Sequence, residues 1–578
     1  MHPVPPVSLV LELDLTSGIR EEPPADPLER LTSRGELALP ELVDRLREAA
    51  TDPRVVGLFA KVGQARMSLA HAQELREAVV EFRRSGKPSI AWAETFGELG
   101  RGTVPYVLAT AFEEIWLQPS GGVGLVGTAT MVVFAREALD RAAVEPLVAR
   151  RHEYKGAAET FLRRELSEPL REATTRLADS AYEQVVTAVA EGRGIAAAQV
   201  RELIDTAPLS AAEALSGGLV DRLGYRDAVR EEIERRSRDE AGRAGRVVPL
   251  RERVARLRHE DEPALVYAAR YQRRGAALRQ LRSRRQKGVA LIRIGGAIRQ
   301  GRSVRGPFGR GSGADTVAAA IRSAAADEHT GAIVLRVNSP GGSYVASDTI
   351  WREVCRAREA GKTVVASMGE VAASGGYYVS MGAELVVALP ATLTGSIGVL
   401  AGKLRAEGLL QRLGLHVDGV GAGAHAQMFS PLTGFSDDEW ASLNAWLDEV
   451  YDDFVGKVAG ARGMTREAVH EVARGRVWTG EDARRRGLVD ELGGLGRALA
   501  LARQRSGLPS DAPVRIHPTR SAVQLLKKPR NSDDAAAASP LPAPTAYLAG
   551  WGDLARAALA LGLPSAGPLV MPPLRLAT

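Results

Sequence analysis

A serine in the second half of the chain has the surroundings that a nucleophile needs. Ser374 follows an apolar run that is rich in β-branched residues, 363–367, and stands between two alanines and two glycines in Ala-Ala-Ser-Gly-Gly. The run predicts a buried strand, and the residues after the serine predict the start of a helix. Small neighbours let a backbone approach the hydroxyl, and a helix N-terminus stabilises developing negative charge. A serine that merely caps a helix has the same local pattern, so this assignment needs partners.

The first partner is a pair of glycines upstream. Gly341 and Gly342 lie in Asn-Ser-Pro-Gly-Gly, between an apolar strand and an amphipathic helix. Paired glycines at such a turn can leave backbone N–H groups pointing at one spot, which is what an oxyanion hole requires. An ordinary connection between a strand and a helix remains the alternative.

The second partner is a base, because a serine hydroxyl needs one to be nucleophilic near neutral pH. Lysine can serve if burial lowers its pKa. The chain has nine lysines, hence 76 − 9 = 67 arginines, and Lys155 stands among Tyr, Gly and two alanines. In so arginine-rich a sequence this lysine is a candidate base, since arginine cannot give up its proton. An exposed surface lysine is the alternative, and His152 and His425 are alternative bases.

An internal repeat sets the architecture that must position these residues. The stretch that ends in Gly-Leu-Val-Asp at Asp221 returns at Asp490, an offset of 490 − 221 = 269, and the stretch that ends at Pro119 returns at Pro390, an offset of 390 − 119 = 271. Strand and helix patterns alternate through both copies, although residues 130–205 look helical throughout. The sequence therefore predicts a tandem duplication. The expected parts are two α/β domains at 5–230 and 287–505, a charged helical linker at 231–286, and a Pro/Ala-rich linker and tail at 506–578.

The two copies have decayed in complementary ways. Ser374 falls on Thr103 at the second offset, 374 − 271 = 103, in a stretch without the Ala-Ser-Gly-Gly pattern. Lys155 falls on Ala424 at the first offset, 155 + 269 = 424. Each copy thus lacks what the other supplies.

The strand–PGG–helix and strand–ASGG–helix pair resembles the Clp-protease/crotonase superfold and, within it, the signal peptide peptidase A (protease IV) family in its long, tandem-duplicated form. The likeness covers about residues 7–500 and includes Ala-Ala-Ser-Gly-Gly-Tyr-Tyr and Tyr154-Lys155-Gly156-Ala157. Clp-like peptidases use a histidine some two dozen residues after the serine, but this chain has no histidine between His329 and His416. Gly156 and Thr160 stand where the family pattern prefers serine and proline.

The resemblance implies a role for each residue of the site. Ser374 is the expected nucleophile, Lys155 the general base, and Gly341 and Gly342 the oxyanion hole. Ser396, in Thr-Gly-Ser, is expected to hydrogen-bond the lysine amine. The resemblance further implies a homo-oligomer, a tetramer-like ring or dome, that degrades cleaved signal peptides or other apolar unfolded peptides.

Composition limits the other classes of function. A net charge of +6 without an aromatic-interleaved basic patch argues against nucleic acid as a partner. The chain has one cysteine, Cys355, and neither Cys-x-x-Cys nor His-Glu-x-x-His spacing, so neither a metal nor another cofactor is expected. No signal peptide or 18-residue apolar span is visible, which predicts a cytoplasmic or peripherally membrane-associated protein. The arginine-rich run at 270–287 could contact an anionic membrane, although a solvated linker explains it as well.

Two other functions fit parts of this pattern. A catalytically silent scaffold or membrane-associated assembly protein would have the same fold with a misaligned dyad. A crotonase-type enzyme acting on acyl-CoA would share the fold without needing Ser374.

Overall fold

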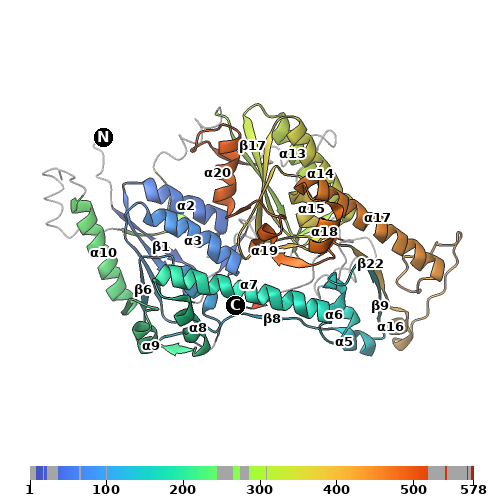
Figure 1. The fold of residues 1–578 in the computed structure, drawn as a ribbon, viewed down its shortest axis with the longest axis horizontal. Helices are drawn as coiled ribbons and strands as arrows, with labels where there is room; N and C mark the ends of the chain where they lie inside the picture. Colours follow the sequence, from blue (N-terminus) through green and yellow to red (C-terminus); the bar gives the residue numbers. More distant parts are fainter. Residues whose placement is uncertain are drawn as a thin grey trace. The chain divides into compact units, whose positions relative to one another are not determined.

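A computed structural model describes residues 8–16, 18–21, 37–63, 65, 67–98, 100–243, 264–271, 273, 286–306, 309–517, 541–542, 569–570 and 575–577. The chain forms two units (Figure 1). The N-terminal unit takes residues 1–129 and 181–284, and the C-terminal unit takes residues 130–180 and 285–577. Most of the arginine-rich run and most of the predicted tail lie outside the described residues. None of the helices within the described ranges is long and apolar enough to cross a bilayer.

The N-terminal unit is built on a six-stranded sheet whose strand order is β11-β6-β5-β4-β1-β12. Every neighbouring pair in it is parallel. The strands are β1 (Leu9–Asp14), β4 (Val55–Lys61), β5 (Ser89–Ala93), β6 (Glu114–Leu117), β11 (Arg222–Leu223) and β12 (Ala264–Tyr267). Helices α2 (Leu39–Thr51) and α3 (Leu69–Arg83) connect the first strands and lie side by side (Figure 1). Parallel strands joined by helices are the layered α/β arrangement that the alternating pattern predicts.

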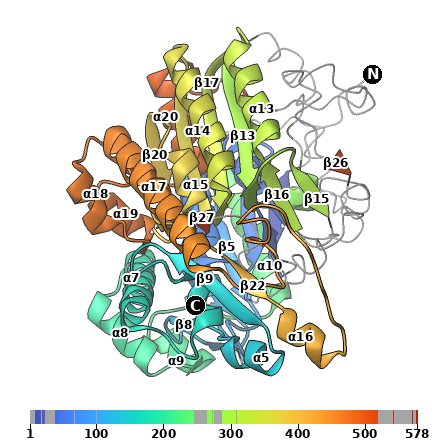
Figure 2. The ribbon, with the colours of Figure 1, turned by 90° about the vertical axis from the view of Figure 1, so that its right-hand side faces the viewer.

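The C-terminal unit repeats this plan with a larger sheet. Its main path is β23-β21-β19-β17-β13-β25, with β20 and β24 attached through β19. These strands are β13 (Gly288–Gly295), β17 (Thr330–Ser339), β19 (Thr363–Ala373), β20 (Leu385–Ala388), β21 (Leu393–Gly395), β23 (Val477–Thr479), β24 (Glu491–Leu492) and β25 (Val514–His517). Helices α13 (Ala314–Ala326) and α14 (Tyr344–Glu359) share one apolar core with the sheet, and α20 (Leu495–Arg505) shares a second (Figure 2). Both faces of the sheet are covered, which is why β17 and β19 are buried along almost their whole length.

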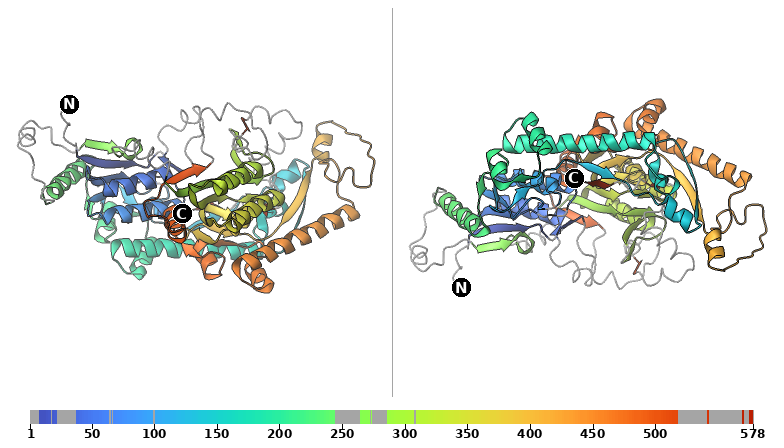
Figure 3. Two further views of the ribbon diagram at one scale, coloured as in Figure 1. Left: turned by 90° about the horizontal axis from the view of Figure 1, so that it is seen from above. Right: turned by 90° about the horizontal axis from the view of Figure 1, so that it is seen from below.

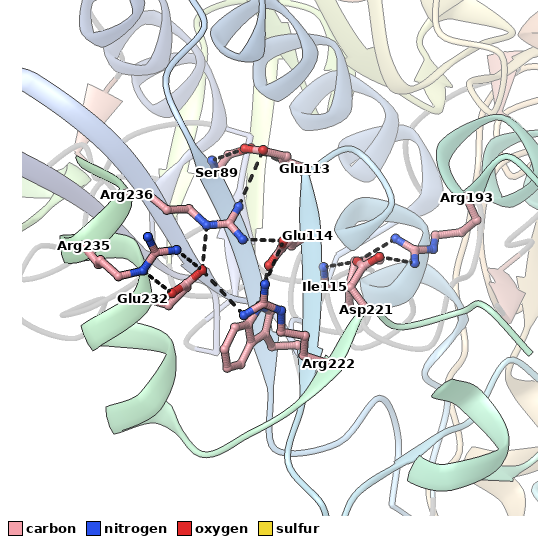
Figure 4. A network of polar contacts seen from close by, with 11 residues as sticks. Ser89, Glu113, Glu114, Ile115, Arg193, Asp221, Arg222, Glu232, Arg235 and Arg236 are labelled. Atoms are coloured by element: carbon pink, nitrogen blue, oxygen red, sulfur yellow. Dashed lines mark hydrogen bonds and ion pairs between the residues drawn. The ribbon is translucent and has the colours of Figure 1, made fainter. Parts of the chain in front are cut away.

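Matching hydrogen bonds mark the duplication in the two units. In the N-terminal unit Tyr106 Oη donates to the carbonyl of Leu219 at 2.6 Å. Arg193 pairs with Asp221 at 2.7 Å in the same unit, as Figure 4 shows. In the C-terminal unit the same bonds join Tyr377 to Leu488 at 3.0 Å and Arg462 to Asp490 at 2.5 Å. Each aspartate also accepts from a strand backbone, at Ile115 and at Val386. The predicted tandem α/β fold is confirmed, whereas the exact boundaries of the repeats stay a prediction.

The helical pattern predicted for residues 130–205 is wrong in part. Residues Glu145–Arg150 form a strand, β9, which pairs antiparallel over its whole length with β22 (Leu400–Arg405), and Figure 3 shows the two strands side by side. Tertiary pairing with a distant strand overrides the local preference here. Helix α7 (Glu168–Arg193) does follow the prediction.

A second helix of the same unit begins at a local sequence signal. Ser436 and Glu439 form a capping box, in which each side chain bonds the other residue's backbone N–H. Helix α17 begins there and runs over Asp437–Arg462.

Candidate active site

Ser374 lies at the junction that the sequence predicts, between β19 and helix α15 (Gly375–Ser380). Its backbone has φ 55°, a left-handed conformation that costs a non-glycine residue free energy. The Ser374 N–H donates to the carbonyl of Gly395 at 2.7 Å, which helps to hold the turn. The side chain is buried. A strained, fully fixed serine at a helix start is typical of a functional residue.

The paired glycines lie directly against this turn as a short strand, β18 (Gly341–Gly342). A Cβ atom on Gly375 would meet the Cα of Gly341 and the N of Gly342 at 3.1 Å each. The glycine turn and the serine turn are therefore in contact through backbone atoms. The two glycines differ, because the Gly341 N–H already donates to Ser339 Oγ at 3.2 Å.

Lys155 belongs to the C-terminal unit, because residues 130–180 are part of it. Its side chain is completely buried. The Nζ atom lies 2.9 Å from Ser374 Oγ, 2.9 Å from the carbonyl oxygen of Ser396 and 3.1 Å from Ser396 Oγ. The structure thus brings together three predicted site residues that are separated by up to 396 − 155 = 241 positions.

These three contacts suit a neutral amine. A neutral amine has two N–H donors and one lone pair, and the Ser396 carbonyl can only accept. If the Ser396 hydroxyl accepts the second N–H, the lone pair is left for the Ser374 hydroxyl. Among the described residues no carboxylate lies within ion-pair distance of Nζ. Burial without a counter-charge lowers the pKa of Lys155 well below 10.5.

The two alternative bases lie elsewhere. The ring of His152 packs 4.2 Å from the ring of Tyr451 and 4.8 Å from that of His470. His152 touches the site through its backbone, whose carbonyl accepts from the Lys155 N–H at 3.4 Å. His425 is exposed on the segment between α16 (Glu407–Arg412) and α17. Of the three candidates, only Lys155 reaches the serine hydroxyl.

A partly buried ion pair that contacts the backbone of the lysine was not identified from the sequence. Glu159 is fully buried and pairs with Arg150 at 2.6 Å. Arg150 also donates to the Lys155 carbonyl at 3.3 Å, and Ser167 Oγ donates to Glu159 at 2.9 Å. The pair therefore fixes the backbone of the lysine. The only available signal is a glutamate that follows small residues in Gly-Ala-Ala-Glu.

Gly475 was missed as well, and it packs on the other side of the lysine. Its φ is +83°, and a Cβ there would lie 2.5 Å from the Lys155 N and 2.6 Å from its Cα and Cβ. All three atoms belong to a residue that is fixed from several sides. Only glycine fits this contact.

Substituting this glycine is expected to disable the site without unfolding the unit. Gly475→Ala should lower peptidase activity about 100-fold, because a shift of about 1 Å in a catalytic group has that effect. Gly463→Ala is the matched control, since Gly463 has φ +62° but no atom within 4 Å of the added Cβ. Equal activities of the two purified variants in a peptide-cleavage assay would show that the contact with Lys155 is unimportant.

One known family model matches this chain twice. The family model described as Peptidase family S49 matches residues 81–238 and 356–509, one match in each sequence repeat. The two matched segments cover 158 + 154 = 312 of the 578 residues.

Individual relatives agree with this match. The serine protease SPPA of Arabidopsis thaliana chloroplasts is 30% identical over 498 residues, which cover 85% of this chain and 69% of that protein. Protease 4 of Salmonella typhi is 34% identical over 480 residues, which cover 82% of this chain and 73% of that protein. A putative signal peptide peptidase SppA of Enterococcus faecium is 37% identical over 167 residues, 29% of this chain and 48% of that protein.

Proposed function

Because the chain belongs to peptidase family S49 and is a serine peptidase, we propose that Ser374 is its nucleophile and Lys155 its general base. The observation that carries this proposal is the 2.9 Å separation between Lys155 Nζ and Ser374 Oγ inside a fully buried site. A serine and a base within hydrogen-bond reach, with the base oriented by a third group, are what nucleophilic catalysis requires. Ser396 supplies that third group.

The proposed reaction is acyl transfer in two steps. Ser374 Oγ attacks the carbonyl carbon of the scissile peptide bond while its proton passes to Lys155 Nζ. The protonated amine then gives that proton to the leaving nitrogen, the C–N bond breaks and an acyl-enzyme forms. A water molecule, deprotonated by the neutral lysine, hydrolyses the ester and returns Ser374 to its starting state.

The glycine turn is proposed to stabilise the oxyanion of each tetrahedral intermediate. Backbone N–H groups aimed at the developing charge contribute more than any other single factor in many acyl-transfer enzymes. Gly342 N lies beside the serine turn, whereas the Gly341 N–H must leave Ser339 Oγ before it can donate to substrate. The positive charge that appears on Lys155 during the reaction is stabilised by the Ser396 carbonyl and hydroxyl.

The proposed substrates are cleaved signal peptides and other apolar, unfolded segments. The name of the Enterococcus relative supports this class. Assembly of several copies into a ring or dome, which would shelter such substrates, stays a prediction from the resemblance.

Hydrolysis assays with casein and with a synthetic signal peptide test the function directly. The purified chain should cleave both. If it is inert on every unfolded peptide tried while folded, the catalytically silent scaffold becomes the better account.

The pH dependence of activity should report the protonation of the lysine. Only the neutral amine can accept the serine proton, so kcat/KM is expected to rise as pH increases through the lowered pKa of Lys155 and then to level off. The measurement is kcat/KM for a peptide without titratable side chains, from acidic pH to about pH 10. A profile that falls over this range would contradict a neutral lysine base.

A further inference from the structure

The C-terminal end of the chain supplies both edges of a second sheet in the C-terminal unit. This sheet has the strand order β26-β15-β16-β14-β18-β27 (Figure 2). Its strands are β14 (Ala297–Arg299), β15 (Val304–Gly306), β16 (Gly309–Gly313), β18, β26 (Leu541–Pro542) and β27 (Leu569–Val570). The two edge strands, β26 and β27, come from the last 40 residues of the 578-residue chain.

Strand β27 pairs with the two glycines of the proposed oxyanion hole. The pairing is antiparallel, with Val570 opposite Gly341 and Leu569 opposite Gly342. On its other side β18 pairs with β14, through Gly342 and Ile298. Another strand can therefore pair with β18 only along the edge that β27 covers.

A peptide substrate needs that same edge. An extended peptide binds an edge strand through main-chain hydrogen bonds, and glycines present a backbone without side chains in the way. The N–H groups of an oxyanion hole must point at a carbonyl oxygen of that peptide. Since a Cβ added to Gly375 would lie only 3.1 Å from backbone atoms of Gly341 and Gly342, the serine turn packs against β18, and a strand paired with β18 passes beside Ser374.

The chemistry of the pairing segment matches the proposed substrates. Leu569, Val570 and the Met571 that follows are apolar and uncharged. Pro568 precedes them, and Pro572 and Pro573 come after. Because proline has no N–H to donate, the flanking residues limit how far a ladder can extend.

We propose that Leu569 and Val570 occupy the position beside β18 at which the backbone of a peptide substrate binds. The chain's own C-terminal segment then competes with apolar peptides for β18. The inference rests on the proposed function in one respect, the position of the nucleophile beside β18. It adds two points to the proposed function. The first is the binding mode of the peptide, an extended strand antiparallel to Gly341 and Gly342, and the second is a competitor for that mode within the same chain. Peptides bind by displacing β27.

A binding measurement tests the competition without relying on catalysis. Both Leu569 and Val570 are changed to proline in a full-length Ser374→Ala chain, which removes the strand's N–H donors whichever residue uses them. The probe is a fluorescein-labelled apolar signal peptide, followed by anisotropy. The double proline variant should bind it about tenfold more tightly than the parent, as expected when a tethered competitor is removed. The matched control changes Ala535 and Ala536 to proline, which adds the same residues to the tail outside β27.

Equal affinities of the parent and the double proline variant would overturn the proposal, as would an equal gain in the Ala535 and Ala536 control. A second measurement, amide hydrogen exchange at Gly342, should show protection that the double proline variant loses, whereas the Gly341 N–H, which donates to Ser339 Oγ, should not depend on β27. That protection should stay constant over an about hundredfold range of protein concentration, because a contact within one chain does not depend on concentration. Protection that grows with concentration would instead assign the strand to a second copy. If the native chain proves inert but the binding gain is present, the proposed function fails and this inference stands.

Discussion

Ser374→Ala is expected to lower kcat for peptide cleavage by at least about 10⁴-fold, because removing the nucleophile of a serine peptidase leaves only the oxyanion hole and substrate binding. The loss should appear in kcat, whereas binding of the peptide should change little. Cleavage of a chromogenic peptide under saturating and limiting substrate gives both values. The small change in side-chain volume at a buried site should leave thermal unfolding nearly unchanged.

Ser380→Ala is the matched control for this variant. Ser380 is also buried in α15, but its hydroxyl donates to the Gly376 carbonyl at 2.8 Å within the helix. Its loss should leave cleavage within a fewfold of the parent. Retained activity in Ser374→Ala would mean that a different residue attacks the substrate.

Lys155→Met is expected to reduce kcat by about 10³- to 10⁴-fold, because the serine loses its base while the apolar chain still fills the buried site. Lys155→Arg should be equally inactive, since arginine cannot accept the proton. The control is Lys403→Met, which removes a partly buried lysine of the same unit. Lys403 Nζ donates to the carbonyls of Met428 and Gly434. If Lys155→Met stays active and Lys403→Met is inactive, then Lys403 rather than Lys155 is needed for catalysis.

The same lysine variant should unfold at a higher temperature than the parent at neutral pH. Burial lowers the pKa of Lys155 in the folded state, whereas the unfolded chain binds a proton up to about the ordinary pKa of 10.5. Folding therefore releases that proton, and the stability of the parent increases with pH between the lowered pKa and 10.5. Methionine removes this cost. The advantage of the variant should shrink as pH approaches 10.5, and a constant advantage would contradict a lowered pKa.

Local patterns pointed to the candidate residues of the site, and the family resemblance supplied their expected roles. Ala-Ala-Ser-Gly-Gly is a local signal for a strand, a tight turn and a helix start around Ser374. The glycine pair at Gly341 and Gly342 is equally local. The duplication was visible because Asp221 and Asp490, which hold matching positions, retain their Gly-Leu-Val-Asp context.

What could not be predicted depends on contacts between distant segments. Strand β9 exists because β22, some 250 positions later (400 − 150 = 250), offers it an edge. The same pairing lies at the start of the segment that carries Lys155, so residues 130–180 join the C-terminal unit rather than the rest of the first sequence repeat. Gly475 looks like an ordinary turn glycine until its contact with Lys155 is known. Periodicity carries no information about such contacts.

The measurement that tests the Ser374–Lys155 dyad most directly is the site and rate of labelling by a fluorophosphonate, which reacts with activated serines. Peptide mapping by mass spectrometry should find the adduct on Ser374 in the native chain, at a rate that rises with pH as Lys155 loses its proton. Lys155→Met should abolish labelling while Lys403→Met leaves it intact. An adduct on another serine, or labelling of Ser374 at an undiminished rate without Lys155, would contradict the dyad.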